Sequence, residues 1–546
     1  MPAQKGTVTS RTDQKPDNCW RWNRRLARRS NDKRFPKRDE RCGSAERHAD
    51  LITTIPTVGV GEATTLSMGW TLDLAGLDEN DFIRSCDVTF KAAVKFIDWD
   101  RNDDGTPLSY YHPFSIPPYL NGYAPAYHCH RRHEGGGGRS FAHSMLGSCA
   151  VLDALKSPRK PGVQSLDGLF PYAYHVNAGL FAGYLREYRK TIGITHVLDD
   201  VVGVNRDERG FVSSLALERG GDHPVEFVID CSGFRSLILE QALEEPFVSF
   251  QESLPCDRVI PMPIDHPEPG GKLPPFTTST GLSAGWSWNV PLWSRRGTGY
   301  VYSSAHISDD EAIAELVAHN GVAPPENSRS IHMNNGRTRH TWAKNCVGMG
   351  LAAGFIEPLE STSIHFVQMS VRWLLDNFPT RDCNPVLQHN FNGLTATLYE
   401  EIRDFIALHY VLNNRDDTPF WRFARDELTC PDRLAHLIEL WRHKLPSAPD
   451  LPNRGALFSE WSYMYVLFGK KFFAGMNFPS KDAIRDADFD EFLFAVASDK
   501  NRLMAEAPDH RAAIAEIREM KSTPWYRPAG TSVDLAGAGG ETGAIA

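Results

Sequence analysis

A short stretch from Gly354 to Phe366 places two carboxylates at the start of a predicted helix, which limits how the surrounding chain can fold. It reads Gly-Phe-Ile-Glu-Pro-Leu-Glu-Ser-Thr-Ser-Ile-His-Phe and follows a strand-like run from Cys346 to Leu351. Ser361 and Thr362 favour the N-cap position, and the mostly apolar run behind them predicts the helix. Free N–H groups at a helix N-terminus attract anions, so this turn can hold a small anion beside a carboxylate. An ordinary capped helix with glutamate in its first turn explains the same composition.

The size and charge of the chain argue against several classes of protein. With 546 residues, 41% of them hydrophobic and 23% charged, the chain is globular and too long for one simple core. The net charge of −9 gives no general reason to expect a nucleic-acid partner, and no apolar run approaches the length of a membrane span. The ten cysteines lack paired zinc-type spacing, so we expect a reduced, cytoplasmic setting.

Four residues of metal-binding type lie close together at His128, Cys129, His130 and His133. They precede four consecutive glycines and alternate more tightly than a standard zinc pattern. We therefore predict a variable surface loop at this point, and no metal site.

Four separated motifs resemble those of the flavin-dependent halogenases related to the tryptophan halogenases. Their order, within a stretch from Leu51 to Lys470, makes the resemblance specific, whereas each motif alone would be weak. They resemble the family's flavin strap, its catalytic-lysine segment, its Trp-x-Trp-x-Ile-Pro motif with Val290 for Ile, and its signature turn. In that order they are Val58–Thr64 (VGVGEAT), Phe90–Phe96 (FKAAVKF), Gly285–Pro291 (GWSWNVP) and Glu357–Thr362 (EPLEST).

The resemblance implies an α/β fold, with an FAD-binding domain of the glutathione-reductase type and a mainly helical substrate module. We expect the FAD-binding halogenase core with its substrate-pocket insertions at residues 51–400, the helical module at 401–527 and a disordered tail at 528–546. Helices are predicted in the module and just before it at Leu394–Leu412, Arg433–His443 and Phe458–Lys470.

Hydrophobic patterns predict further elements between these motifs. Tyr172 opens a predicted helix that continues through Tyr188, and two strands follow at His196–Val204 and Phe211–Leu217. The run Phe227–Cys231 predicts a buried parallel strand that ends in a glycine turn.

By resemblance, Lys91 and Glu360 are the catalytic residues. In the family, FADH2 from a separate flavin reductase reacts with O2, and chloride or bromide is converted to hypohalous acid. Lys91 would present this acid to an electron-rich aromatic, such as an indole or pyrrole, as a hydrogen-bonded acid or a haloamine. Glu360 would stabilise the developing positive charge or take the ring proton. Most lysines are solvated surface residues. Apolar surroundings would instead adapt the Lys91 ammonium for proton donation or nucleophilic attack.

The other site residues are also assigned by resemblance. Thr362 and Ser363 would bind halide through their backbone N–H groups. The substrate pocket would include His112, Phe114 and Ser361, while Trp286 and Trp288 would keep the flavin and the substrate apart. Cofactor contacts are expected from Val60, Gly61, Ala63, Val201, Asp230, Gly233, Leu351 and Ile364.

One departure from the family pattern concerns the halide turn. Tryptophan halogenases usually have glycine where Ser363 stands, followed by Ile and Tyr, whereas this chain has Ser363-Ile364-His365. Because the halide would be bound by backbone N–H groups, a serine side chain is tolerated at this position. It narrows the space beside the halide. The resemblance therefore does not imply free tryptophan as the substrate. It also leaves open whether the halide is chloride or bromide and whether the protein forms a homodimer.

Residues 1–50 differ from the rest because they are polar, rich in arginine and without a strand pattern. They could form a basic targeting or binding arm, or a disordered segment. The family begins instead with a strand and a Gly-x-Gly-x-x-Gly turn that holds the FAD pyrophosphate, and that turn is missing here.

A frame shift explains this difference more sharply. Tryptophan has the single codon TGG, so reading one base later turns Trp20 and Trp22 into glycines. With suitable codons, Asn18–Arg29 becomes Ile-Val-Gly-Gly-Gly-Thr-Ala-Gly-Trp-Arg-Ala, which supplies the missing strand and turn, and the frame would be restored by about Asp50. As written, the chain would bind FAD weakly or not at all. Two alternatives to a halogenase remain, a flavin monooxygenase on the same scaffold and an inactive apoprotein.

Overall fold

The computed structural model describes residues 48–51, 61–118, 125–133, 140–322, 329–451, 457–478 and 486–520. The chain divides into two compact units, Met1–Glu46 and Arg47–Ala546, and all described residues belong to the second. Three predictions lie outside the described residues: the basic stretch with its frame shift, the flavin contact at Val60, and the tail at 528–546.

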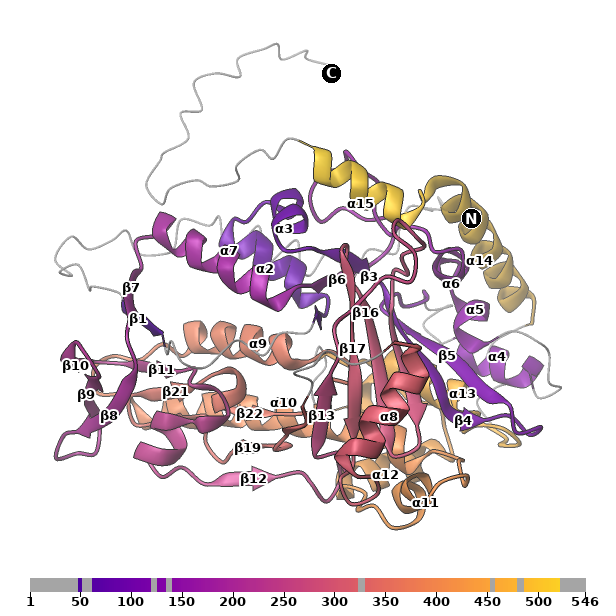
Figure 1. Ribbon diagram of the computed structural model, residues 1–546. Helices are drawn as coiled ribbons and strands as arrows, with labels where there is room; N and C mark the ends of the chain where they lie inside the picture. Colours follow the sequence, from indigo (N-terminus) through magenta and orange to yellow (C-terminus); the bar gives the residue numbers. More distant parts are fainter. Residues whose placement is uncertain are drawn as a thin grey trace, which may run out of the picture. The chain divides into compact units, whose positions relative to one another are not determined.

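The largest sheet contains the tryptophan motif and the strand that follows the lysine motif (Figure 1). Its strand order is β18-β13-β17-β16-β15-β4-β5, and β14 pairs with β17 off this path. β15 and β4 pair in parallel, whereas β15–β16, β16–β17 and β4–β5 are antiparallel. The strands are β4 (Ala93–Arg101), β5 (Pro107–Pro113), β13 (Arg258–Pro261), β14 (Ile264–Asp265), β15 (Thr277–Leu282), β16 (Gly285–Pro291), β17 (Arg295–Tyr302) and β18 (Ile331–His332).

A small antiparallel sheet joins the lysine motif to the end of the strap. Its order is β2-β6-β3, with β2 at Glu62–Ala63, β6 at Ala173–Val176 and β3 at Thr89–Lys91. The helix predicted from Tyr172 is therefore wrong at its start. Those residues pair with both β2 and β3, and α7 (Ala178–Thr191) begins only after the Asn177 side chain caps it.

Four further sheets complete the strand structure of the described residues. Two are antiparallel, with orders β12-β19-β22 and β10-β9-β8, and β1–β7 and β11–β21 are parallel pairs, the second extended by β20. The bounds are β1 (His48–Leu51), β7 (Thr195–Leu198), β8 (Val201–Arg206), β9 (Val212–Leu217), β10 (Gly221–Pro224), β11 (Val228–Asp230), β12 (Phe247–Ser249), β19 (Gly336–Thr338), β20 (Trp342–Ala343), β21 (Cys346–Gly348) and β22 (Gly354–Phe355).

Strand β11 is parallel, as predicted, but it is not fully buried. Among the described residues it pairs on one side only, with β21. Ile229, in its centre, is 47% exposed, and Phe234 just beyond it is 41% exposed. One edge of this strand thus presents apolar side chains that the described residues do not cover.

Helices surround these sheets, and their ends follow the capping rules. Ser308 and Glu311 form a capping box at the start of α8, and Asn384 caps α10 ahead of a proline at its first position. The helices are α2 (Ser67–Ala75), α3 (Glu79–Ser85), α4 (Ala126–His133), α5 (Phe141–Met145), α6 (Ser148–Asp153), α7, α8 (Asp309–Asn320), α9 (Ser363–Asp376), α10 (Pro385–Val411), α11 (Pro419–Asp426), α12 (Asp432–Trp441), α13 (Glu460–Gly469), α14 (Asp486–Glu506) and α15 (His510–Glu519), with short helical turns η1 (Gly233–Arg235), η2 (Leu237–Ala242), η3 (Gly350–Ala352) and η4 (Ala448–Asp450).

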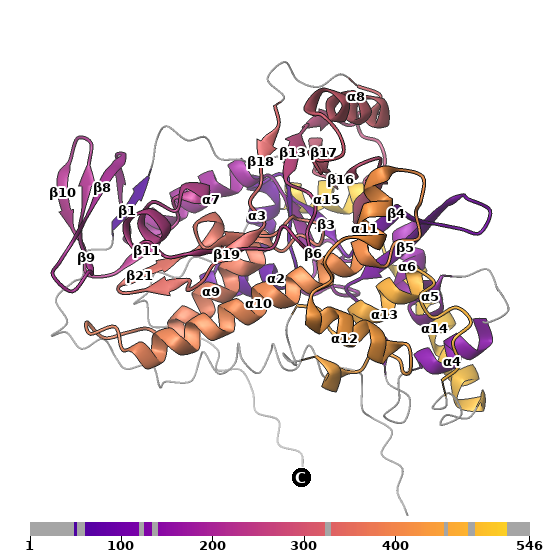
Figure 2. The same cartoon turned by 90° about the horizontal axis from the view of Figure 1, so that it is seen from below.

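The three helices predicted from Leu394 onward are present as α10, α12 and α13. Helix α10 is the long helix in Figure 2; it contacts α9, α11 and α12, and α13 packs against β5 of the large sheet. The predicted domain boundary between residues 400 and 401 falls inside α10.

The surface loop predicted around His128 is wrong. Residues 126–133 form helix α4, in which His128 and His130 are buried. The His128 ring stacks on Phe489 with 5.1 Å between ring centroids, so a helix from the far end of the chain covers it. No group of three or more potential metal ligands occurs within the described ranges.

Candidate active site

Lys91 is completely buried at the end of β3, beside the residues of the signature turn. β6 lies between β2 and β3, which brings Thr64, the residue after β2, next to Lys91. The Lys91 ammonium donates to the Thr64 carbonyl at 3.2 Å and to the Ser361 hydroxyl at 2.9 Å. It also lies 5.2 Å from the centroid of the Phe114 ring.

Burial sets the charge of this lysine. It lowers the pKa of Lys91 to about 7, although the nearby Glu360 carboxylate acts in the opposite direction. Near neutral pH the side chain is therefore divided between ammonium and amine, so it can act as a proton donor or as a nucleophile. A solvated surface lysine would do neither readily.

The signature turn holds Ser361 in a left-handed backbone conformation, with φ of 63°. Such a φ is unfavourable for a residue other than glycine, and here it aims the hydroxyl at Lys91. Thr362 is the N-cap of α9, but its side chain makes no capping hydrogen bond. Its hydroxyl is buried without a partner among the described residues. The turn therefore presents an unused donor at a helix N-terminus, which suits a small anion.

Glu360 is buried directly before Ser361 and accepts a hydrogen bond from His112 Nδ1 at 2.8 Å. His112 is at the end of β5, two residues before Phe114. Aromatic rings of α10 and the α13 region surround the imidazole, with Phe405 and Phe458 at centroid distances of 5.6 and 6.1 Å. The structure thus brings Lys91, Glu360, Ser361, His112 and Phe114 close together.

The two predicted tryptophans lie on β16 and are both buried. Their ring centroids are 6.3 Å apart. Trp288 pairs across the sheet with Gly299 of β17, where a Cβ atom would come within 2.0 Å of the indole. Gly299 is therefore the residue that makes room for this ring.

Sequence reasoning gave Glu357 no role, yet it is one of the most perturbed groups of the site. It is fully buried, and burial raises its pKa to about 8, although contacts with Tyr410, Trp286 and Cys256 act against that rise. Its two oxygens and the Trp286 indole nitrogen lack hydrogen bonds of good geometry among the described residues. The carboxyl is thus neutral at neutral pH and lies beside the tryptophan pair.

His409 was also missed, because a lone histidine in an apolar helix is usually a packed core residue. It lies in the last turn of α10, fully buried, with Nε2 3.7 Å from Glu360 Oε1. The sequence gives no signal that would connect it to a glutamate 49 positions earlier.

The residues at the end of the strap fit the ring end of a flavin. Gly61 has φ of +108°, and a Cβ there would lie 3.2 Å from the Cα of Gly297, so the strap packs tightly on the β17 strand. Ala63 follows in β2, and Leu351 and Ile364 are half-buried near the start of α9. The Thr362 hydroxyl, buried and unpartnered among the described residues, lies at the start of the same helix.

Two of the other predicted cofactor residues lie at the end of β11. Gly233 has φ of +72° and open space around it. The Asp230 carboxylate accepts hydrogen bonds from the backbone N–H groups of Ser232, Ile238 and Leu239, so it fixes the turn. Val201 starts β8, which belongs to a separate small sheet. A glycine turn for the pyrophosphate is not found within the described ranges.

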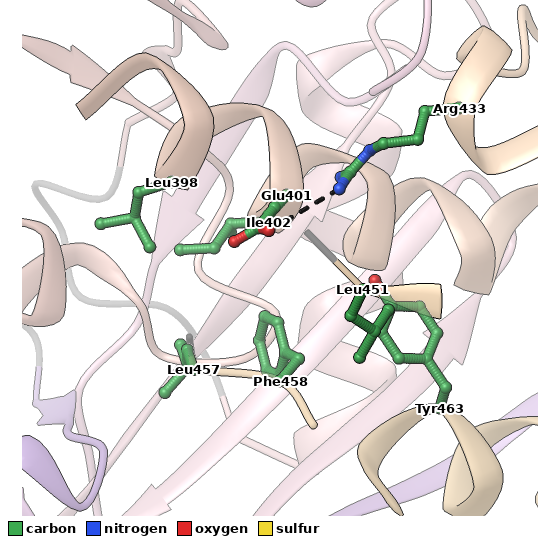
Figure 3. A pocket seen from close by; sticks show the side chains of 8 residues that line it. All are labelled: Leu398, Glu401, Ile402, Arg433, Leu451, Leu457, Phe458 and Tyr463. Atoms are coloured by element: carbon green, nitrogen blue, oxygen red, sulfur yellow. Dashed lines mark ion pairs between the residues drawn. The ribbon is translucent and has the colours of Figure 1, made fainter. Parts of the chain in front are cut away.

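A small pocket lies between α10, α12 and the start of α13 (Figure 3). Its volume is about 10 Å³, room for about one water molecule. Arg433 and Glu401 form an ion pair at 3.8 Å in it, and Phe458 stacks on Phe405 at 3.8 Å. It is lined by Leu398, Glu401, Ile402, Arg433, Leu451, Leu457, Phe458 and Tyr463. Phe458 therefore separates this pocket from His112.

Comparison with known proteins agrees with this arrangement. The family model described as tryptophan halogenase matches residues 51–486. The chain is 34% identical over 438 residues to a tryptophan 6-halogenase of Streptomyces toxytricini, covering 76% of this chain and 82% of that protein. It is 36% identical over 403 residues to a tryptophan 7-halogenase of Lentzea aerocolonigenes, covering 71% and 75%.

The fold is shared with solved structures. The tryptophan halogenase of Shewanella frigidimarina superposes with a TM-score of 0.81 at 29% identity, over 87% of this chain and 90% of that one. This confirms the predicted α/β fold class. Within the ranges that the structure describes, no helix is both long and apolar enough to cross a membrane.

Proposed function

Because this chain belongs to the tryptophan halogenase family of flavin-dependent enzymes, we propose that it halogenates an electron-rich aromatic such as an indole. The co-substrates would be O2 and chloride or bromide, with FADH2 from a separate flavin reductase. The observation that carries the proposal is the buried pair of Lys91 and Glu360, joined through Ser361 and backed by His112.

The residues that would hold FAD belong to two groups. Gly61, Ala63 and Ile364 would contact the ring end, and Gly233 at the end of β11 would lie toward the adenosine half. When bound and reduced, FAD supplies the oxidising chemistry that turns halide into hypohalous acid. The N–H groups of Thr362 and Ser363 at the start of α9 would hold the halide.

Lys91 would direct the hypohalous acid at the ring. Its ammonium donates in two directions, to Thr64 and Ser361, which fixes Nζ in one place. One of its three protons remains to bond the acid, and the amine form could instead carry the halogen. In both cases the low pKa of Lys91 keeps proton transfer easy near neutral pH.

Glu360 would stabilise the positive charge that forms on the substrate ring. His112 holds its carboxylate in position, and burial excludes the water that would otherwise weaken the interaction. His112 and Phe114 would bracket the flat substrate. The relatives that are named tryptophan halogenases suggest an indole ring as substrate, and Ser363 leaves the choice between free tryptophan and other indoles open.

The decisive experiment incubates the protein with indole, FAD, a flavin reductase and bromide, and analyses the product by mass spectrometry. We expect brominated indole, and none when bromide is left out. A hydroxylated product that forms without halide would instead favour a flavin monooxygenase. No binding of added FAD would favour an inactive apoprotein.

A further inference from the structure

A cluster of buried polar side chains lies next to Glu360 and does not include Lys91. Both ring nitrogens of His409 and the hydroxyl of Tyr110 are buried and lack a hydrogen bond to any described residue. Both rings stack on Phe96, at centroid distances of 4.5 and 5.1 Å. Buried polar groups are nearly always satisfied, so these three atoms point to a use or to bound water.

The cluster continues to a buried ion pair. Lys470, just after α13, donates to Asp100 of β4 at 2.7 Å, and both side chains are fully buried. Asp100 also accepts from the backbone N–H of Asn414 at 3.1 Å, and Asn414 is exposed. Burial raises the pKa of Tyr110, and the negative charges of Asp100 and Glu360 raise it further.

His112 already contacts one oxygen of Glu360. Its Nδ1 lies 2.8 Å from Oε1 and donates to the carboxylate in the tautomer that carries the hydrogen on Nδ1. His409 Nε2 lies 3.7 Å from the same oxygen, a gap that a small shift or one water molecule closes. Burial lowers the pKa of His409, and Lys470 and His112 lower it further, so the imidazole is neutral with a free lone pair.

We propose that His409 is a proton-relay residue that takes the proton from Glu360 after each turnover. The inference rests on the halogenation proposed above. In that reaction the arene and hypohalous acid give the haloarene and water. The carbon–halogen bond forms while the oxygen–halogen and ring C–H bonds break; the ring proton passes to Glu360, and the departing hydroxide takes a proton from the Lys91 ammonium.

The kinetic test measures turnover of indole in H2O and in D2O for the native protein and for His409→Phe. Phenylalanine keeps the stacking on Phe96 and is apolar in a buried position, so the fold should be retained. We expect the native enzyme to show a solvent deuterium isotope effect close to unity. In His409→Phe, turnover should fall at least about 10-fold, with a clear solvent isotope effect and an unchanged KM, because loss of the proton from Glu360 has become the slow step.

Two further variants separate a relay from a packing role. His409→Gln keeps a polar side chain without a basic nitrogen and should behave like His409→Phe. Tyr399→Phe, on the same helix and equally buried, should leave turnover and isotope effect unchanged. An isotope effect that stays at unity in both His409 variants would overturn the proposal.

A second measurement does not depend on activity. The imidazole nitrogens are observed by 15N NMR in the native protein and in Glu360→Gln, with His409→Phe used for assignment. We expect the signals of both His112 and His409 to move when the carboxylate becomes an amide. If only His112 responds, His409 is not coupled to Glu360 and the relay is rejected, even if halogenation itself is observed.

Discussion

At the scale of single residues, Lys91 is held in an environment that disfavours its charge. The pKa near 7 means that the buried ammonium weakens the fold at pH values below it. Sequence reasoning identified this lysine from its motif. Its burial depends on Ser361, which lies 270 positions later in the chain. The sequence pattern around Lys91 therefore could not predict it.

Replacing Lys91 by Met should stabilise the protein while it abolishes halogenation. The penalty for the buried ammonium is fully present below the folded pKa of about 7 and fades as the pH rises toward the unfolded value of 10.5. Each unit of that shift is worth about 1.4 kcal/mol, so the gain is a few kcal/mol near about pH 6 and shrinks toward about pH 10. Thermal melts across this range measure it. A gain that does not depend on pH would mean that the pKa of Lys91 is the same in the folded and unfolded chains, so that burial does not lower it.

Glu357 offers a second pH test, with the opposite trend. Its raised pKa means that the carboxyl stays protonated in the folded chain while it ionises in the unfolded chain above about 4.5. Native stability therefore falls between pH 4.5 and about 8, and levels off above the folded pKa. Glu357→Gln lacks this loss, so its advantage in melting temperature should grow across that window. A constant difference between the two proteins would show that Glu357 is ionised in the fold.

At the scale of elements, the strands near the motifs were predicted well and buried polar segments were not. The strand predicted at Phe211–Leu217 is present as β9, and the strand-like run from Cys346 to Leu351 contains the shorter β21. The run after Tyr172 had no decisive period, and its strand depends on pairing with β2 and β3. His128 and His130 seemed suited to a loop, because the aromatic residues that cover them come from far along the chain.

Gly299→Ala should disturb the packing of Trp286 and Trp288 without replacing either tryptophan. The added methyl group would overlap the Trp288 ring, and overpacking of this kind costs about 1–3 kcal/mol. If Trp288 separates flavin from substrate, the variant should form more hydrogen peroxide or hydroxylated product per halogenated product. Gly393→Ala on α10, where nothing lies within 4 Å, is the matched control. An unchanged product ratio in Gly299→Ala would remove this role from Trp288.

At the scale of the whole molecule, two parallel strand pairs belong to small sheets that are separate from the eight-stranded sheet. Among the described residues, β1 pairs only with β7, and β11 pairs with β21 on one side, with Ile229 exposed. The frame-shift hypothesis concerns the stretch before β1, which lies outside the described residues. The gene sequence tests it directly, since codons that cannot encode the shifted peptide would end the idea.

Restoring that peptide in place of Asn18–Arg29 should improve both flavin binding and stability. A glycine turn lets the backbone approach the pyrophosphate, and FAD bound to the folded chain stabilises it. FAD titration followed by absorbance, together with thermal melts, compares the restored protein with the chain as written. Equal affinity in the two proteins would show that the glycine turn is dispensable here.

The most direct test of the account asks where the oxidised halogen goes. Indole and a soluble trap for free hypohalous acid are supplied together, and both products are measured for the FAD-loaded native or restored protein and for its Lys91→Met variant. We predict halogenated indole with little trapped acid when Lys91 is present, and trapped acid with almost no halogenated indole when it is absent. Equal yields of halogenated indole from the two proteins would contradict the claim that the buried Lys91, beside Glu360, directs the halogen to the ring.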